Sequence, residues 1–112
     1  MVALRPGAES LELARKIVRA SVEEVGGDEA LSYAAQLAAS EVLSAMFERR
    51  DADVELRSVV SPQQLEVVIR GHDEPHRLRE SDMRRRLVDA VADEVIVSVE
   101  GWTMTVILRF AL

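Results

Sequence analysis

The chain has 112 residues and an acidic charge balance, with 20 Asp and Glu against 14 Lys and Arg and a formal net charge of −6. This length supports one hydrophobic core, so we expect a single domain over residues 1–112. The acidic excess opposes binding to nucleic acid, because phosphates repel a negatively charged surface. The absence of cysteine excludes disulfides, thiolate metal ligands and cysteine nucleophiles.

The sequence also argues against a membrane protein. No segment is apolar over a length that could cross a bilayer, and residues 1–7 do not have the pattern of a signal peptide. We therefore expect a cytoplasmic protein with no membrane association. Hydrophobic residues make up 48% of the chain and charged residues 30%, which is typical of a globular domain rather than a disordered chain.

The first half of the chain is expected to form two helices after a short apolar start. Apolar residues recur at three- and four-residue steps over residues 11–25, with Ser10 as the N-cap and Gly26-Gly27 as the stop. A second helix is predicted over residues 28–49. Its apolar residues cover more than a narrow stripe, as in a helix at the centre of a core: Leu31, Ala34, Ala35, Leu37, Ala38, Val42, Ala45 and Met46.

The second half is expected to form two β-hairpins separated by a third helix, because the apolar period changes to two. The strand segments are 54–60, 65–69, 95–99 and 102–112, and the last two are joined by a turn at Glu100-Gly101. Trp102 and Met104 should face the core. The helix should span residues 81–92. Its core-facing residues are expected to be Met83, Leu87, Val88 and Val91. These elements predict an α+β two-layer sandwich, with three helices on one face of a mostly antiparallel sheet.

Four segments resemble, in the same order, the anti-sigma-factor serine kinases, a bacterial branch of the histidine-kinase-like ATPases. They are Ala14–Val18 with Val25-Gly26, Ser40–Phe47, Leu65–Ile69 and Leu87–Val95. The family's central helix carries Ser-Glu-Leu-x-x-Asn, in which Glu polarises a nucleophile and the Asn oxygen holds Mg²⁺. The resemblance implies a histidine-kinase-like ATPase fold, with Glu41 at the Glu position. The Asn position is Ala45, whose side chain offers no oxygen to a hard cation.

The other nucleotide-binding positions of the family also differ in this chain. The family's adenine-binding Asp corresponds to Gly71, and Asp73 and Pro75 stand where two glycines follow it. At the start of the last helix, the glycines that approach the phosphates correspond to Asp82 and Arg84. The lid before that helix is much shorter than the family's. We therefore expect no cofactor: the chain should bind neither ATP nor Mg²⁺.

Two features of the sequence could indicate a catalytic base or a metal site. Glu41 could act as a general base if a nucleotide were bound; without one, we expect it to be a vestige with no catalytic role. The segment His72-Asp73-Glu74-Pro75-His76 offers imidazoles and carboxylates to a metal. Its proline prevents a regular helix from aligning the two histidines, and a solvated turn is the simpler interpretation. We predict no metal site.

A basic segment interrupts this acidic chain around the start of the last helix. It is either a solvated helix start or a docking patch for an acidic partner, because arginine is favoured at protein interfaces. We predict that it binds the partner. Its residues are Arg77, Arg79, Arg84, Arg85 and Arg86.

The resemblance implies a regulatory protein that acts by protein binding. Active members of the family bind a sigma factor and a small anti-anti-sigma protein, and ATP tunes the choice between them. Without ATP binding, we expect a non-catalytic, anti-sigma-factor-like protein whose partner is of one of these two kinds and whose regulation rests on competition. Two alternatives stay open. One is a weak ATP-dependent serine kinase that uses Glu41 with a rebuilt metal site, and the other is a structural homodimer.

Overall fold

The computed structural model describes residues 1–48, 53–72 and 82–112, and in the last of these ranges it describes side chains from Arg85 onward. The described residues form three helices and five strands. In chain order they are β1 (Val2–Leu4), α1 (Ala8–Glu24), α2 (Glu29–Phe47), β2 (Val54–Val60), β3 (Gln64–His72), α4 (Asp82–Val91), β4 (Glu94–Glu100) and β5 (Thr103–Ala111).

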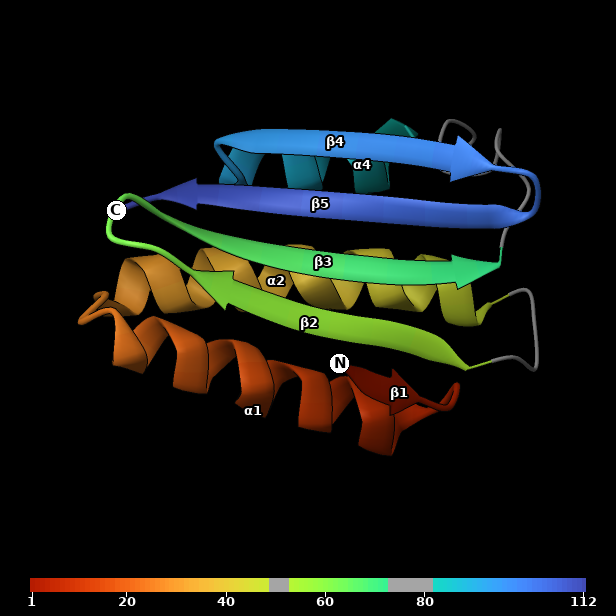
Figure 1. Ribbon diagram of the computed structural model, residues 1–112, viewed down its shortest axis with the longest axis horizontal. Coiled ribbons are helices and arrows are strands. Elements are labelled where there is room, and N and C mark those ends of the chain that lie inside the picture. Colours follow the sequence, from red (N-terminus) through yellow and green to blue (C-terminus); the bar gives the residue numbers. More distant parts are fainter. Residues whose placement is uncertain (49–52, 73–81) are drawn as a thin grey trace.

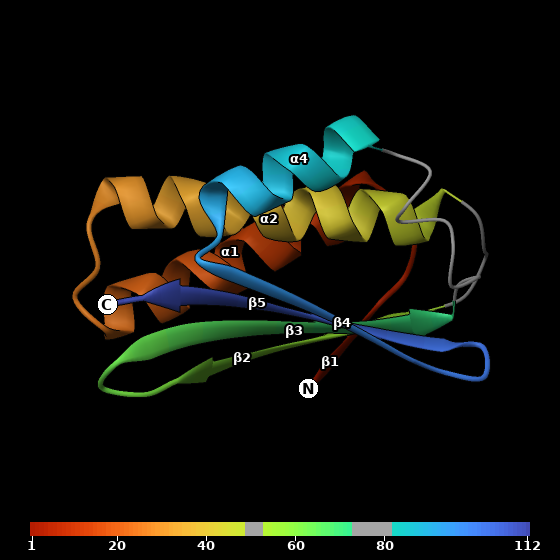
Figure 2. The ribbon, with the colours of Figure 1, turned by 90° about the horizontal axis from the view of Figure 1, so that it is seen from above.

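The five strands form one antiparallel sheet in the order β1-β2-β3-β5-β4. Figure 2 shows α1, α2 and α4 as a layer on one face of this sheet. In that layer α2 lies between α1 and α4, behind the central strands in Figure 1. The predicted two-layer α+β sandwich, with helices on one face of an antiparallel sheet, is confirmed.

The core lies between the helix layer and the sheet, where alternate strand residues point toward the helices. From β3 and β5, the buried side chains on this face are Leu65, Val67, Ile69, Met104, Val106, Leu108 and Phe110. From α2, the alanines at 35, 38 and 39 are almost fully buried, which allows the helix to approach the sheet closely. Leu43 is also fully buried, although it was not among the apolar residues predicted to form the core face of α2.

The ends of α1 and α2 follow local capping chemistry. The Oδ1 of Asp28 accepts a hydrogen bond from the Leu31 N–H at 2.9 Å, so α2 begins where the sequence predicted. The predicted N-cap of α1 was wrong, because this helix begins one turn earlier, after Gly7, and Ser10 lies inside it. Gly26 follows α1 with a φ of 68°, a left-handed conformation that favours glycine and ends the helix.

Two side chains predicted to face the core are exposed. Trp102 is 60% exposed because it lies in the two-residue turn that joins Glu100 to its partner Thr103, and it is not a strand residue. Leu87 is 37% exposed, whereas its neighbour Val88 is 3% exposed and faces the core. Met104 is fully buried, as predicted. None of the helices in the described ranges has both the length and the apolar content needed to cross a membrane.

Candidate functional site

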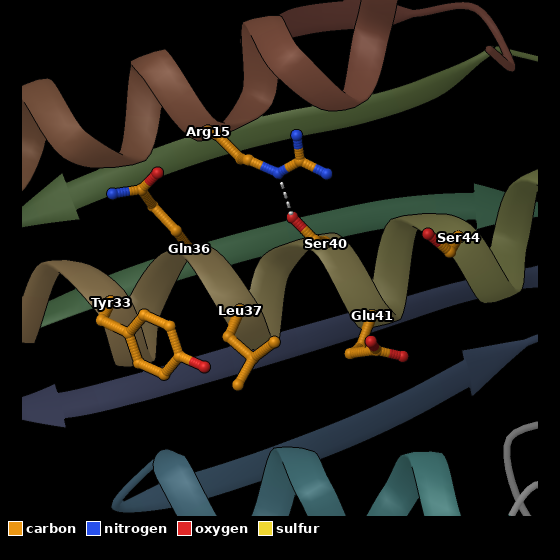
Figure 3. Close-up of a pocket in the computed structure, with 7 residues that line it drawn as sticks. All are labelled: Arg15, Tyr33, Gln36, Leu37, Ser40, Glu41 and Ser44. Carbon is orange, nitrogen blue, oxygen red and sulfur yellow. Dashed lines mark hydrogen bonds between the residues drawn. The ribbon is translucent and has the colours of Figure 1, made fainter. Parts of the chain in front are cut away.

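A surface pocket of about 330 Å³ lies along the outer side of α2, away from the sheet. Arg15 of α1 lines it together with six α2 residues: Tyr33, Gln36, Leu37, Ser40, Glu41 and Ser44. Figure 3 shows that Gln36 and Ser40 project toward α1, whereas Tyr33, Leu37 and Glu41 project toward α4. The structure therefore places Glu41, the predicted vestigial catalytic residue, half-buried in the wall of a pocket on the face of α2 that is directed toward α4.

A hydrogen bond connects α1 to α2 on one side of this pocket, and a second one lies within α2. The Nε of Arg15 donates a hydrogen bond to the Ser40 hydroxyl at 3.0 Å, and the Gln36 amide donates one to the Ser32 hydroxyl at 2.8 Å. Leu37 is the one aliphatic residue in a lining otherwise made of hydroxyl, amide and charged groups and a tyrosine ring. Small-molecule pockets are lined mainly by apolar side chains and span roughly 300–1,000 Å³. The pocket lies at the lower end of this range, and its lining is more polar than that of the next pocket along α2.

A second and more apolar pocket continues along α2 toward its C-terminal end. It has a volume of about 480 Å³ and shares Ser44 with the first pocket. Its other lining residues are Pro6, Gly7, Ala8, Leu11, Phe47 and Glu48. The two pockets together extend from Tyr33 to Phe47. This stretch of α2 covers about 21 Å at 1.5 Å per residue, a length suited to a peptide segment or a partner helix.

Ala45 occupies the position at which the family resemblance implies a magnesium ligand. It follows Glu41 by four residues, so the two lie on the same side of α2. Its methyl group packs against the hydrophobic core cluster and supplies no oxygen. Among the described residues there is no group of three His, Cys, Asp or Glu side chains close enough to hold a metal ion. The described part of α2 therefore contains no candidate metal centre.

Gly71 occupies the position at which the resemblance implies an adenine-binding Asp, and the structure places it in the core. It is buried near the end of β3, opposite Met104 of β5. A Cβ atom added at Gly71 would lie 3.1 Å from the Met46 Sδ and 3.3 Å from the Val54 Cγ2. The space that an Asp side chain would enter is thus already occupied by apolar atoms of α2 and β2.

The predicted arginine patch is described only in part. Arg77 and Arg79 lie outside the described residues, and the structure describes the backbone of Arg84, which lies in α4. Arg85 is half-buried, and its Nε donates to both carboxylate oxygens of Asp89 at 3.1 and 3.2 Å, one helical turn away. Arg86 is exposed. The two described arginine side chains therefore differ, since one is tied to a carboxylate and the other extends into solvent.

The segment considered for a metal site is represented by one described residue. His72 lies at the end of β3, and its Nδ1 donates a hydrogen bond to the Trp102 carbonyl oxygen at 3.3 Å. Residues 73–76 lie outside the described ranges, so the prediction that this segment holds no metal remains a prediction. The contact ties the end of β3 to the β4–β5 turn.

The opposite face of the sheet carries an ion-pair ladder that was not predicted from the sequence. Arg109 of β5 bonds Glu66 of β3 at 2.7 Å, and it also bonds Glu94 of β4. These hydrogen bonds, first with Glu66 and then with Glu94, raise the pKa of the Arg109 guanidinium. The three residues occupy alternate, outward-facing strand positions, a signal that the sequence does contain. Their pairing depends on the strand order and register, which alternation within single strands does not specify.

No protein-family model matches this chain, and no curated protein matches it.

Proposed function

We propose that the protein is a non-catalytic regulator that binds another protein and has the scaffold of an anti-sigma-factor serine kinase without its ATP chemistry. The observation that carries this proposal is the packing around Gly71. Apolar atoms of Met46 and Val54 fill the position from which an adenine-binding carboxylate would have to act. Nucleotide binding there would require the core itself to rearrange, and such rearrangements of a close-packed interior are costly.

Ala45 adds independent support, because a methyl group stands where the family resemblance implies the magnesium ligand. A polyphosphate bound without its metal would meet an acidic protein, which weakens binding further. Glu41 remains in the wall of a pocket, but a carboxylate alone has no phosphoryl group to transfer. On this proposal Glu41 is a vestige, and the partner rather than a nucleotide occupies the surface near α2 and α4.

The proposed partner surface is the start of α4 and the residues before it, Arg77, Arg79, Arg84, Arg85 and Arg86. A partner with an acidic surface is steered toward positive charge on an otherwise acidic protein, and charges at the rim of an interface act mainly on the association rate and its salt dependence. The proposed partner is a sigma factor or an anti-anti-sigma-like protein. The first pocket on α2 is directed toward α4 through Tyr33 and Leu37, and α4 packs against α2, so one partner can contact both surfaces.

Co-purification of the tagged protein from its native cell, followed by identification of the bound protein, supplies the partner for a quantitative test. Arg84→Glu with Arg85→Glu should weaken binding of that partner more than tenfold, or about 1.4 kcal/mol, while the circular dichroism spectrum stays unchanged. Arg85 also loses its pair with Asp89, which costs only a few tenths of a kcal/mol on a helix surface.

The matched control reverses the same amount of charge elsewhere. Arg19 on α1 and Arg57 on β2 are exposed, and both lie outside α4. Arg19→Glu with Arg57→Glu should leave affinity within about twofold at physiological salt, because screening weakens charges that lie beyond the interface. An equal loss in both double variants would mean that net charge, not the α4 surface, controls binding. A loss in the control alone would move the interface to α1 and β2.

A further inference from the structure

β4 forms one edge of the sheet, and no strand of the described residues pairs with the backbone groups on its outer side. In the strand order β1-β2-β3-β5-β4, it has β5 on one side and no strand of the described chain on the other (Figure 1). In an antiparallel ladder, alternate residues direct their N–H and C=O groups toward the neighbouring strand, and the residues between them direct theirs away from it. The seven residues of β4 therefore offer hydrogen-bond donors and acceptors to a further strand.

The opposite edge of the sheet, at β1, is protected against the addition of a further strand, whereas the β4 edge is not. β1 has three residues, and Arg5 and Pro6 follow it directly. β1 pairs only with residues 54–56 of β2. Farther along β2, α1 packs against the strand, and the Ser21 hydroxyl of α1 is hydrogen-bonded to the Ser58 hydroxyl of β2. Short strands, prolines and basic residues are the usual means by which proteins prevent strand addition at an edge. β4 contains none of these, and its five central residues read Val-Ile-Val-Ser-Val.

The side chains of β4 define what an added strand should carry on the helix side of the sheet. Val95, Val97 and Val99 point toward this side, where they pair with Leu108, Val106 and Met104 of β5. Coverage decreases along the strand, because Val95 and Val97 are half-buried whereas Val99 is 36% exposed. β-Branched or aromatic residues at alternate positions of an added strand would cover these valines.

Both ends of β4 carry a carboxylate. Glu94 shares Arg109 with Glu66, so two carboxylates compete for one guanidinium. Glu100 is exposed, and no ion pair of Glu100 occurs among the described residues. A basic residue opposite each glutamate is stabilising across antiparallel strands, and a like charge is destabilising. A second copy of this chain paired along the full length of β4 would place Glu94 opposite Glu100 at both ends, and each copy carries a net charge of −6.

We propose that β4 binds an extended segment of a partner protein, which adds to the sheet as a sixth strand. The geometry points to a segment with β-branched residues at alternate positions and a Lys or Arg at each end, six residues apart, to match Glu94 and Glu100. Backbone hydrogen bonds supply the affinity in this mode of recognition, and alternate side chains supply the specificity. This surface is separate from the arginine patch, and the proposal holds whether or not the chain binds a nucleotide.

A capped synthetic peptide, Lys-Val-Thr-Val-Thr-Val-Lys, is the direct probe, and its binding is measured by fluorescence anisotropy and by amide chemical shifts. The peptide should bind, and the largest shifts should fall on β4. Glu100→Lys should weaken binding at least tenfold, and a peptide with Glu in place of one terminal Lys should recover most of the loss. The control Glu23→Lys makes the same charge change on an exposed residue of α1 and should leave binding unchanged.

Two N-methylated peptides test whether backbone hydrogen bonds hold the segment. Methylation of the three valines removes N–H donors from one edge of the peptide, and methylation of the two threonines removes them from the other edge. One of the two should lose at least tenfold in affinity and the other should not, because only one edge of the peptide faces β4. The proposal is overturned by absence of binding at about 1 mM peptide, by equal losses in Glu100→Lys and Glu23→Lys, or by equal behaviour of the two methylated peptides. It is also overturned if the protein alone forms a dimer that Glu100→Lys strengthens, because this change removes the like charge opposite Glu94 of the second copy.

Discussion

Gly71→Asp would install the carboxylate that the family resemblance implies, and the structure predicts that this change destabilises the fold without creating a nucleotide site. The first added atom alone meets the Met46 Sδ at 3.1 Å and the Val54 Cγ2 at 3.3 Å, which are closer than ordinary van der Waals contacts. Overpacking of this kind costs about 1–3 kcal/mol. A carboxyl group enclosed by apolar atoms adds about 1–3 kcal/mol when it lacks hydrogen-bond partners.

The expected total for Gly71→Asp is therefore about 2–6 kcal/mol, a large share of the roughly 5–15 kcal/mol that stabilises a small domain. Gly71→Ala isolates the steric part and should cost about 1 kcal/mol, since the flexible Met46 side chain can move by a few tenths of an ångström. Urea denaturation of the three proteins at pH 7 measures both values. If Gly71→Asp is as stable as the parent and gains saturable ATP binding, the position faces a ligand and the packing argument is refuted.

Two further predictions follow from burial and from the position of Glu41. Phe110→Ala should lower the free energy of unfolding by about 3–5 kcal/mol because the ring is 1% exposed, whereas Trp102→Ala should lower it by less than about 1 kcal/mol because its side chain is 60% exposed. Chemical denaturation measures both changes. A blue-shifted tryptophan emission of the native protein would contradict the exposed position of Trp102 in the turn. Glu41→Gln should leave stability within about 1 kcal/mol and partner affinity unchanged, since the amide keeps the size of the side chain; loss of a phosphotransfer activity in this variant would instead support a kinase.

Local sequence signals were sufficient for much of the architecture. Apolar residues largely alternate over residues 54–60 and 103–111, with Val59 and Ile107 among the exceptions, which favours one face for the core, and the strand assignments hold in the structure. The second helix begins at the predicted place, where the Asp28 side chain caps it. These features depend on neighbouring residues alone, which is why the sequence was enough to predict them.

The errors occurred where two local solutions have similar energies. The last hairpin can turn at residues 100–101 or at 101–102; Gly101 is compatible with both, and the choice of the second exposes Trp102. In α4, Leu87 and Val88 are adjacent apolar residues, and packing against α2 and the sheet decides which one is buried.

The candidate site depended on contacts between distant segments. Arg15 bonds Ser40 across 25 residues, and Arg109 bonds Glu66 across 43 residues. Neither pair has a spacing that local periodicity could reveal. The enclosure of Gly71 by Met46 and Val54 likewise required the packing of α2 onto β2 and β3. The sequence indicated that the expected Asp was missing, and the structure supplied the reason why none fits.

A titration of the protein with ATP and Mg²⁺, followed by thermal unfolding, tests the central claim most directly. Ligand at about 100 times its Kd stabilises the folded state by about 2.7 kcal/mol, which corresponds to roughly 10 °C in Tm for a domain of this size. The absence of a chelating residue at Ala45 and the filled space at Gly71 predict no change in Tm at saturating nucleotide. A saturable, magnesium-dependent increase in Tm would contradict the account and would establish that the chain retains a nucleotide site.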